Sequence, residues 1–112
     1  MVLNLIKVDR SNGALLRLLT GRDPDELAAA GIGTVGARPE HLELTAGSVA
    51  TVQLVERLGA ESLVHLTLSD SPDAFTVLTT DRLVAFGQAR SLQIAAERLH
   101  FFDSAGQRLA PC

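Results

Sequence analysis

The sequence predicts a mainly β fold with one short helix, arranged as an antiparallel sandwich or barrel. Short apolar runs alternate with turn residues at intervals of about ten residues, as in antiparallel sheets. One pair of these runs is separated by a glycine-containing turn that suits a hairpin. Another segment has a helix-start signal and a helix-stop signal. We expect strands at residues 2–8, 14–19, 32–37, 48–57, 62–69 and 74–79.

The composition is that of an ordered globular domain rather than a disordered tail. Apolar residues make up 46% of the chain and charged residues 21%. A length of 112 residues suffices for one hydrophobic core and is too short for two domains of usual size. The sequence therefore predicts a single domain.

The same composition disfavours several classes of function. A formal net charge of -3, with no Trp and no Tyr, argues against binding nucleic acid, which needs cationic groups for phosphates and aromatic rings for bases. Because Cys112 is the one cysteine, we expect no internal disulfide, no cysteine-based metal site and a reducing, cytoplasmic setting. The apolar N-terminal stretch is interrupted by Asn4 and Lys7, and no run approaches the ~20 apolar residues of a membrane span. We expect binding, dimerisation or regulation, without direct membrane insertion.

The first two predicted strands, 2–8 and 14–19, should form a hairpin. Residues 9–13 join them, and Asn12 and Gly13 tolerate the left-handed backbone that a reversal needs.

Residues 23–30 have the signals of the short helix. Asp23 is an N-cap candidate, Pro24 suits the first helical position, and Gly31 follows as a stop. We expect about two helical turns there.

The clearest hairpin joins the predicted strands 48–57 and 62–69. Gly59 occupies the first central position of the turn Leu58–Glu61, where a type II′ turn requires a positive φ. Alternation along both strands predicts one core-facing apolar set, made of Ala50, Val52, Leu54, Val64, Leu66 and Leu68.

Residues 88–100 have two possible structures. Leu92 and Ile94 alternate like a strand, but a longer apolar set recurs at helical spacing, so periodicity alone favours a helix. That set is Ala89, Leu92, Ala96 and Leu99.

Some patterns imitate functional motifs without their context. Residues 31–36 match G-x-G-x-x-G, but they follow a predicted helix instead of a strand, and Pro39 falls where the next helix would run. We interpret these glycines as a loop that leads into a strand. Ser48 lacks the second glycine of a nucleophile elbow. The histidines stand singly, without metal-ligand spacing, at His41, His65 and His100. We expect no catalytic, cofactor-binding or metal-binding residues, and His65 should lie on the outer face of its strand.

Two carboxylate pairs could be proposed as an acid and a base. Nothing in the sequence gives the two members of either pair different roles, so solvated carboxylates at strand ends are expected instead. The pairs are Glu40 with Glu43 and Glu56 with Glu61.

A polar corner follows the third predicted strand. Arg38 precedes Pro39 and is therefore restricted to extended backbone, so the turn would present Arg38, Glu40 and His41 in a set geometry. Two interpretations stay open here: a structural corner with a local Arg38–Glu40 ion pair, or a binding surface.

Several ordered segments resemble a known family. They are Gly36–Leu42 (GARPEHL), Val55–Glu61 (VERLGAE) running into Leu63–His65, Leu99–Asp103 (LHFFD) and Gly106–Leu109 (GQRL). Their order and spacing resemble the C-terminal regulatory domain, called TOBE (transport-associated OB), of ABC importer ATPase subunits of the maltose, sugar and glycerol-phosphate type. Ala37 departs from the usual Ile or Val.

The resemblance implies an OB-like antiparallel β-barrel and makes residues 91–96 a strand. It covers residues 32–109, while residues 1–31, a lead-in hairpin and short helix, match weakly. The chain has no P-loop, ABC signature or acidic strand end for magnesium. ATP and Mg²⁺ would therefore belong to an ATPase domain preceding Met1 in the parent protein, with no cofactor held by this chain.

The resemblance further implies a non-catalytic regulatory and dimerisation domain of an importer for carbohydrates or related solutes. Its partners would be its own ATPase domain, a second copy, a regulatory protein and, indirectly, the permease at the inner face of the plasma membrane. Candidate interface or regulatory residues are Arg38, Glu40, His41, Glu56, Gly59 and Glu61. The alternative is a module that binds molybdate-like oxyanions, as related TOBE-type domains do. The single Lys7 and the absence of an evident Ser/Gly nest argue against it.

Overall fold

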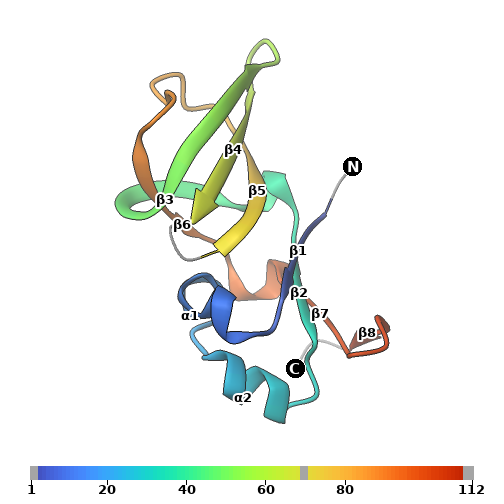
Figure 1. Cartoon of the computed structure of the whole chain (residues 1–112). Helices are drawn as coiled ribbons and strands as arrows, with labels where there is room; N and C mark the ends of the chain where they lie inside the picture. The colour runs from blue at the N-terminus through green and yellow to red at the C-terminus, as the bar shows by residue number, and fades with distance from the viewer. Residues whose placement is uncertain (1–2, 69–70, 110–112) are drawn as a thin grey trace.

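The computed structural model describes residues 3–68 and 71–109, whose strands form two antiparallel four-stranded sheets that curl into a half-barrel (Figure 1). The first sheet has the order β1-β2-β7-β8, with β1 (Asn4–Lys7), β2 (Thr34–Ala37), β7 (His100–Phe102) and β8 (Arg108–Leu109). The second has the order β5-β4-β3-β6, with β3 (Glu43–Arg57), β4 (Ser62–Leu68), β5 (Ser71–Thr79) and β6 (Ala89–Gln93). The predicted mainly β, OB-like fold is confirmed.

Five of the six predicted strands correspond to β1 to β5, although β3 and β5 begin earlier than predicted. Val2, Ser69 and Cys112, which entered the predictions, lie outside the described residues.

The predicted strand at 14–19 and its hairpin are wrong, because this segment is the helix α1 (Gly13–Thr20), preceded by the 3₁₀ turn η1 (Arg10–Asn12). The segment consists of Ala, Leu and Arg, which are strong helix formers, and has no β-branched residue before Thr20. Leu15, Leu16 and Leu19 are buried at helical spacing. Gly21, at φ 75°, ends the helix and donates its N–H to the Arg17 carbonyl at 2.9 Å.

The predicted helix after Asp23 is confirmed as α2 (Pro24–Ala29). Asp23 Oδ1 accepts a hydrogen bond from the Glu26 N–H at 2.9 Å, which satisfies one of the free donors of the first turn. The loop that leads from α2 into β2 contains Gly31 and Gly33, as predicted for the G-x-G-x-x-G match.

The predicted hairpin of β3 and β4 is also confirmed. Gly59 has φ 96°, whereas Ala60 has no positive φ, which is the combination of a type II′ turn. The Leu58 N–H donates to the Glu61 carbonyl at 2.8 Å and closes the turn.

One face assignment in this hairpin is wrong. The pairing of β3 with β4 shifts between Val52 and Leu54, so that Leu54 is opposite His65 and Val55 is opposite Val64. A shift of one residue exchanges the two faces of a strand. Leu54 is therefore 52% exposed, whereas Val52 and Val64 are fully buried.

Of the two structures that the sequence allowed for residues 88–100, the strand is the one observed. β6 covers Ala89–Gln93, so the helix indicated by periodicity is wrong, and the strand that the resemblance implied is present up to residue 93. Residues 94 and 95 leave the sheet, and a 3₁₀ turn, η3 (Ala96–Arg98), leads into β7.

One hydrophobic cluster joins the helices to both sheets. Its fully or almost fully buried members come from α1, α2, β2, β4 and β6 and include Leu16, Leu27, Val35, Val64 and Leu92. None of the helices in residues 3–68 and 71–109 has the length and apolar character that crossing a bilayer requires.

Candidate functional site

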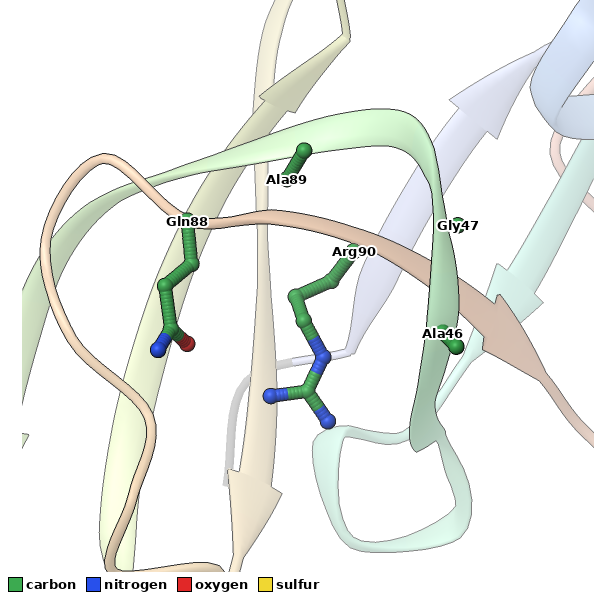
Figure 2. A pocket seen from close by; sticks show the side chains of 5 residues that line it. All are labelled: Ala46, Gly47, Gln88, Ala89 and Arg90. Carbon is green, nitrogen blue, oxygen red and sulfur yellow. The ribbon is translucent and has the colours of Figure 1, made fainter.

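A shallow pocket of about 400 Å³ lies where β3 bulges against β6 (Figure 2). Both Ala46 and Ala50 pair with Arg90, so the intervening residues of β3 arch away from the ladder. The pocket is lined by Ala46, Gly47, Gln88, Ala89 and Arg90. None of the candidate interface or regulatory residues from the sequence lines it, since no motif marked this bulge.

The charged group of this pocket is already engaged by the protein. Arg90 Nε donates to the Thr45 carbonyl at 3.2 Å, and Nη1 and Nη2 lie 3.4 Å from Asp81 Oδ2. Gln88 Nε2 donates to the Leu83 carbonyl at 3.0 Å, while its Oε1 is buried with no donor among the described residues. The pocket offers little free polar chemistry to a ligand.

The β3–β4 hairpin contains three of the candidate contact residues predicted from the sequence, Glu56, Gly59 and Glu61. His65 Nε2 lies 2.6 Å from Glu56 Oε1 on the outward face of the sheet, which confirms the outer-face position of His65. Gly59 and Glu61 form the exposed tip. A partly exposed polar contact of this kind contributes only about 0–1 kcal/mol to stability, so it orients side chains more than it holds the fold.

The polar corner is the 3₁₀ turn η2 (Pro39–His41). Arg38 has φ -76° and ψ 139°, the extended backbone expected before proline, and its carbonyl accepts the His41 N–H at 3.0 Å. Pro39 is buried, whereas Arg38 and Glu40 are exposed. Arg38 and Glu40 form no ion pair, so that part of the structural interpretation is not observed.

The structure does not gather the predicted residues into one site. In Figure 1 the hairpin tip stands at the top of the view, well above the corner at residues 39–41. The corner packs against β5, and Arg38, which precedes it, follows β2, the strand that pairs with the C-terminal strand β7.

The register of the first sheet determines which residues share a face with Arg38. Gly36 pairs with His100, and Phe102 pairs with Arg108. Because directly opposed residues, and residues two apart on one strand, share a face, Arg38, His100 and Arg108 share the outer face of this sheet. Sequence spacing could not give this register, since β2 and β7 are more than sixty residues apart by the bounds of the strands.

His100 is electrostatically perturbed by this arrangement. Burial lowers the pKa of His100 below its ordinary value of 6.5, and the positive charges of Arg108, Arg38 and His41 lower it further. The groups that add to the effect of burial come from the Arg38–His41 corner and from β8.

The lowered pKa predicts a pH dependence of stability. The unfolded chain takes up a proton on this imidazole near pH 6.5, whereas the folded chain does so only at lower pH. Stability should therefore fall as the pH falls from 6.5 through the folded-state pKa, with no such contribution above that window. Urea unfolding across this range should give a smaller loss for His100→Gln than for the native chain. Equal losses in the two proteins would contradict the assignment to His100.

A further surface feature is the loop of residues 80–88 between β5 and β6. Leu83 and Phe86 are 84% and 75% exposed. The loop itself is anchored, because Val84 is fully buried, Arg57 Nη2 donates to the Val84 carbonyl at 2.8 Å, and the Gly87 N–H donates to the Val52 carbonyl at 2.8 Å. Two large apolar side chains are thus held outward on an anchored loop.

Comparisons with known proteins match this chain to one domain family and to two import ATP-binding proteins. A model of the TOBE domain family matches residues 35–102. The sn-glycerol-3-phosphate import ATP-binding protein UgpC of Rhizobium meliloti (strain 1021) is 35% identical over 88 residues, which are 70% of this chain and 25% of that protein. The protein of the same name from Ruegeria pomeroyi is 31% identical over 112 residues, covering 96% of this chain and 32% of the relative. The chain thus spans about a quarter to a third of the length of these relatives.

Proposed function

This chain belongs to the TOBE domain family, and from that premise we propose that it is the non-catalytic regulatory and dimerisation domain of an ABC importer ATPase subunit. The observation that carries the proposal is the family match over residues 35–102, together with two relatives that are named as import ATP-binding proteins. ATP and Mg²⁺ belong to the ATPase domain of such a subunit, and this chain holds neither.

The solute class follows from the names of the relatives. Both are named for the import of sn-glycerol-3-phosphate, so we propose that the parent importer carries a carbohydrate or a related polyol phosphate. The domain then lies at the cytoplasmic face of the membrane and contacts the permease only through the ATPase domain.

Two surfaces support a contact role. The hairpin around Glu56, Gly59 and Glu61 presents the exposed Leu54 and Leu58 beside charged groups, which suits a regulatory protein or the ATPase domain. The corner of Arg38, Glu40 and His41 presents exposed charge on a rigid turn. The exposed residues of either surface can be substituted without removing a core residue.

Self-association is assigned to the anchored loop of residues 80–88. Burying Leu83 and Phe86 against a second copy removes two large side chains from water, each contributing about 1.5–3 kcal/mol when fully buried. Association costs several kcal/mol in lost translational and rotational freedom, so we expect a weak dimer of the chain by itself.

Sedimentation equilibrium tests this directly. The native chain should show reversible dimers at high micromolar concentration, and the double variant Leu83→Ser with Phe86→Ser should be monomeric at the same concentration. Leu5→Ser is the matched control, since Leu5 is 60% exposed on the other sheet. A native chain that stays monomeric, or a control that dissociates as completely as the double variant, would count against this surface.

A further inference from the structure

The outer face of the first sheet is open to solvent. Ile6 of β1 joins Leu16 of α1 and Leu27 of α2 in the hydrophobic cluster, and both helices lie on one side of β1 and β2 in Figure 1. That side is the inner face of the sheet. Leu5 and Lys7 alternate with Ile6 and therefore lie on the outer face, where Leu5 is 60% exposed and Lys7 is exposed too.

An apolar strip runs over this outer face from β1 to β7. A Cβ atom at Gly36 would lie 2.9 Å from Leu3 Cδ2 and 3.0 Å from Phe102 Cε2, so this glycine leaves the space in which the two side chains meet. Phe101 packs against the hydrophobic cluster, which leaves its neighbour Phe102 on the outer face. Leu5 is paired with Gly36 and adds its exposed side chain. We call Leu3, Leu5 and Phe102 the apolar strip.

Three cations lie on the same face as the apolar strip. One row of paired residues crosses the sheet from β1 to β8 in the order Lys7, Thr34, Phe102 and Arg108. Lys7 and Arg108 are therefore about 14 Å apart, across three strand spacings of about 4.8 Å. Arg38 directly follows β2 with extended backbone, so it continues the alternation of that strand on the outer face.

The strands of this sheet offer these cations no carboxylate. Their sequences are NLIK, TVGA, HFF and RL. Asp9 and Asp103, which follow β1 and β7, accept N–H groups of their own turns. Neither of the ion pairs found in the described part of the chain includes a cation of this face. The face is thus apolar and positively charged, in a chain whose net charge is -3.

The chemistry of this face favours an acidic protein segment over a lipid surface. Binding to a membrane surface depends on apolar side chains that reach into the boundary between headgroups and acyl chains. Leu3 and Phe102 are half-buried over Gly36 instead of projecting from the sheet. A segment of protein can place an apolar side chain on the strip and its carboxylates on the cations around it.

The separation of the cations selects an extended segment. In an extended chain, residues i and i+4 lie on the same side and about 13 Å apart, which matches the separation of about 14 Å between Lys7 and Arg108. Residue i+2 lies between them on that side, where Phe102 and Thr34 occupy the middle of the row. The matching pattern is acidic-x-apolar-x-acidic.

We propose that the outer face of the first sheet docks an extended segment of a partner protein that carries the pattern acidic-x-apolar-x-acidic. The two carboxylates pair with Lys7 and Arg108, the apolar side chain packs on the apolar strip, and Arg38 adds attraction at longer range. This goes beyond the proposed regulatory role and does not depend on it. The face is separate from the loop of residues 80–88, to which self-association is assigned, because that loop connects two strands of the second sheet.

The test follows the backbone amide signals of the whole chain by NMR while the synthetic peptide SEGFGES is added. Signals of β1, β2 and β7 should shift with a Kd of about 1 mM or below, and high salt should weaken binding. Peptides with Lys in place of both Glu residues, or with Ser in place of Phe, should bind at least about tenfold more weakly. Vesicles of phosphatidylglycerol are the second arm. Equal binding of the three peptides, no binding of SEGFGES, or binding of the vesicles alone overturns the proposal.

Variants of the chain separate this face from general charge. Lys7→Gln, Arg108→Gln and Leu5→Ser should each weaken binding of SEGFGES by about fivefold. Arg82→Gln is the matched control, because Arg82 is an exposed arginine in the loop between β5 and β6 and should leave binding unchanged. All four side chains are exposed, so the amide spectrum of the folded chain should persist in each variant. Weakening by Arg82→Gln as large as that by Lys7→Gln and Arg108→Gln, or no weakening by either of these two, would overturn the docking face.

Discussion

Leu16→Ala should lower the free energy of unfolding by about 2–5 kcal/mol. Leu16 is fully buried in α1, and α1 is packed into the same hydrophobic cluster as β4 and β6. Truncation removes apolar contacts and leaves a cavity that the surrounding structure fills only in part. Urea denaturation followed by circular dichroism measures the change.

The same residue distinguishes the helix from the strand that alternation predicted. In a strand, Leu16 and Leu18 would share a face and be equally sensitive. In the helix they do not, and Leu18 is only partly buried. Leu18→Ala should therefore cost clearly less than Leu16→Ala. Equal costs, or a larger cost at Leu18, would contradict the helix and its packing.

Asn4→Ala should lower the free energy of unfolding by about 2–3 kcal/mol. Asn4 Nδ2 donates to the Thr76 carbonyl at 2.7 Å, and Asn4 Oδ1 accepts the Thr76 N–H at 2.8 Å. β5 is the edge of its sheet, so this side chain takes the place of a neighbouring strand and ties the two sheets together. Its loss leaves two backbone groups of Thr76 without their partners.

Gln93→Ala is the control for this prediction. Gln93 Nε2 donates to Glu43 Oε2 at 2.8 Å in an exposed position, where water replaces the lost partner. Its replacement should change stability by less than about 0.5 kcal/mol. If thermal and urea unfolding gave Asn4→Ala and Gln93→Ala the same stability, the hydrogen bonds between Asn4 and Thr76 would not contribute to the stability of the fold.

The elements that the sequence predicted well have local signals. The hairpin of β3 and β4 follows from alternation and from Gly59, and α2 follows from Asp23 and Pro24. The failures have local causes too. Alternating leucines in α1 also fit a strand, and helix propensity was the better guide. The register shift after Val52, which exposes Leu54, leaves no trace in the alternation itself.

The candidate sites were predictable only in part. Arg38 and His41 were found because proline fixes their turn, but His100 and Arg108 were not grouped with them. That His100 and Arg108 lie on the same face of the sheet as Arg38 depends on the pairing of β2 with β7 and of β7 with β8, which is a property of the tertiary fold. The roles of Glu40, Glu56, Gly59 and Glu61 as contact residues stay predictions.

The domain has one set of buried surfaces and another set of exposed ones. The core face of each sheet is buried, Arg90 in the shallow pocket is engaged by Thr45 and Asp81, and the charged corner, the hairpin and the anchored loop are exposed. These exposed surfaces are the ones that the proposed regulatory role would use.

The most direct test of that regulatory role is a domain replacement in an importer of sn-glycerol-3-phosphate. This chain would take the place of the TOBE domain in the ATP-binding subunit, and solute uptake by cells would be measured beside a subunit that lacks the domain. We expect this chain to restore uptake, and the Asn4→Ala version, weakened in its fold, to restore less. Uptake no better than with the domain missing, from a chimera that is folded and present at normal levels, would contradict that role.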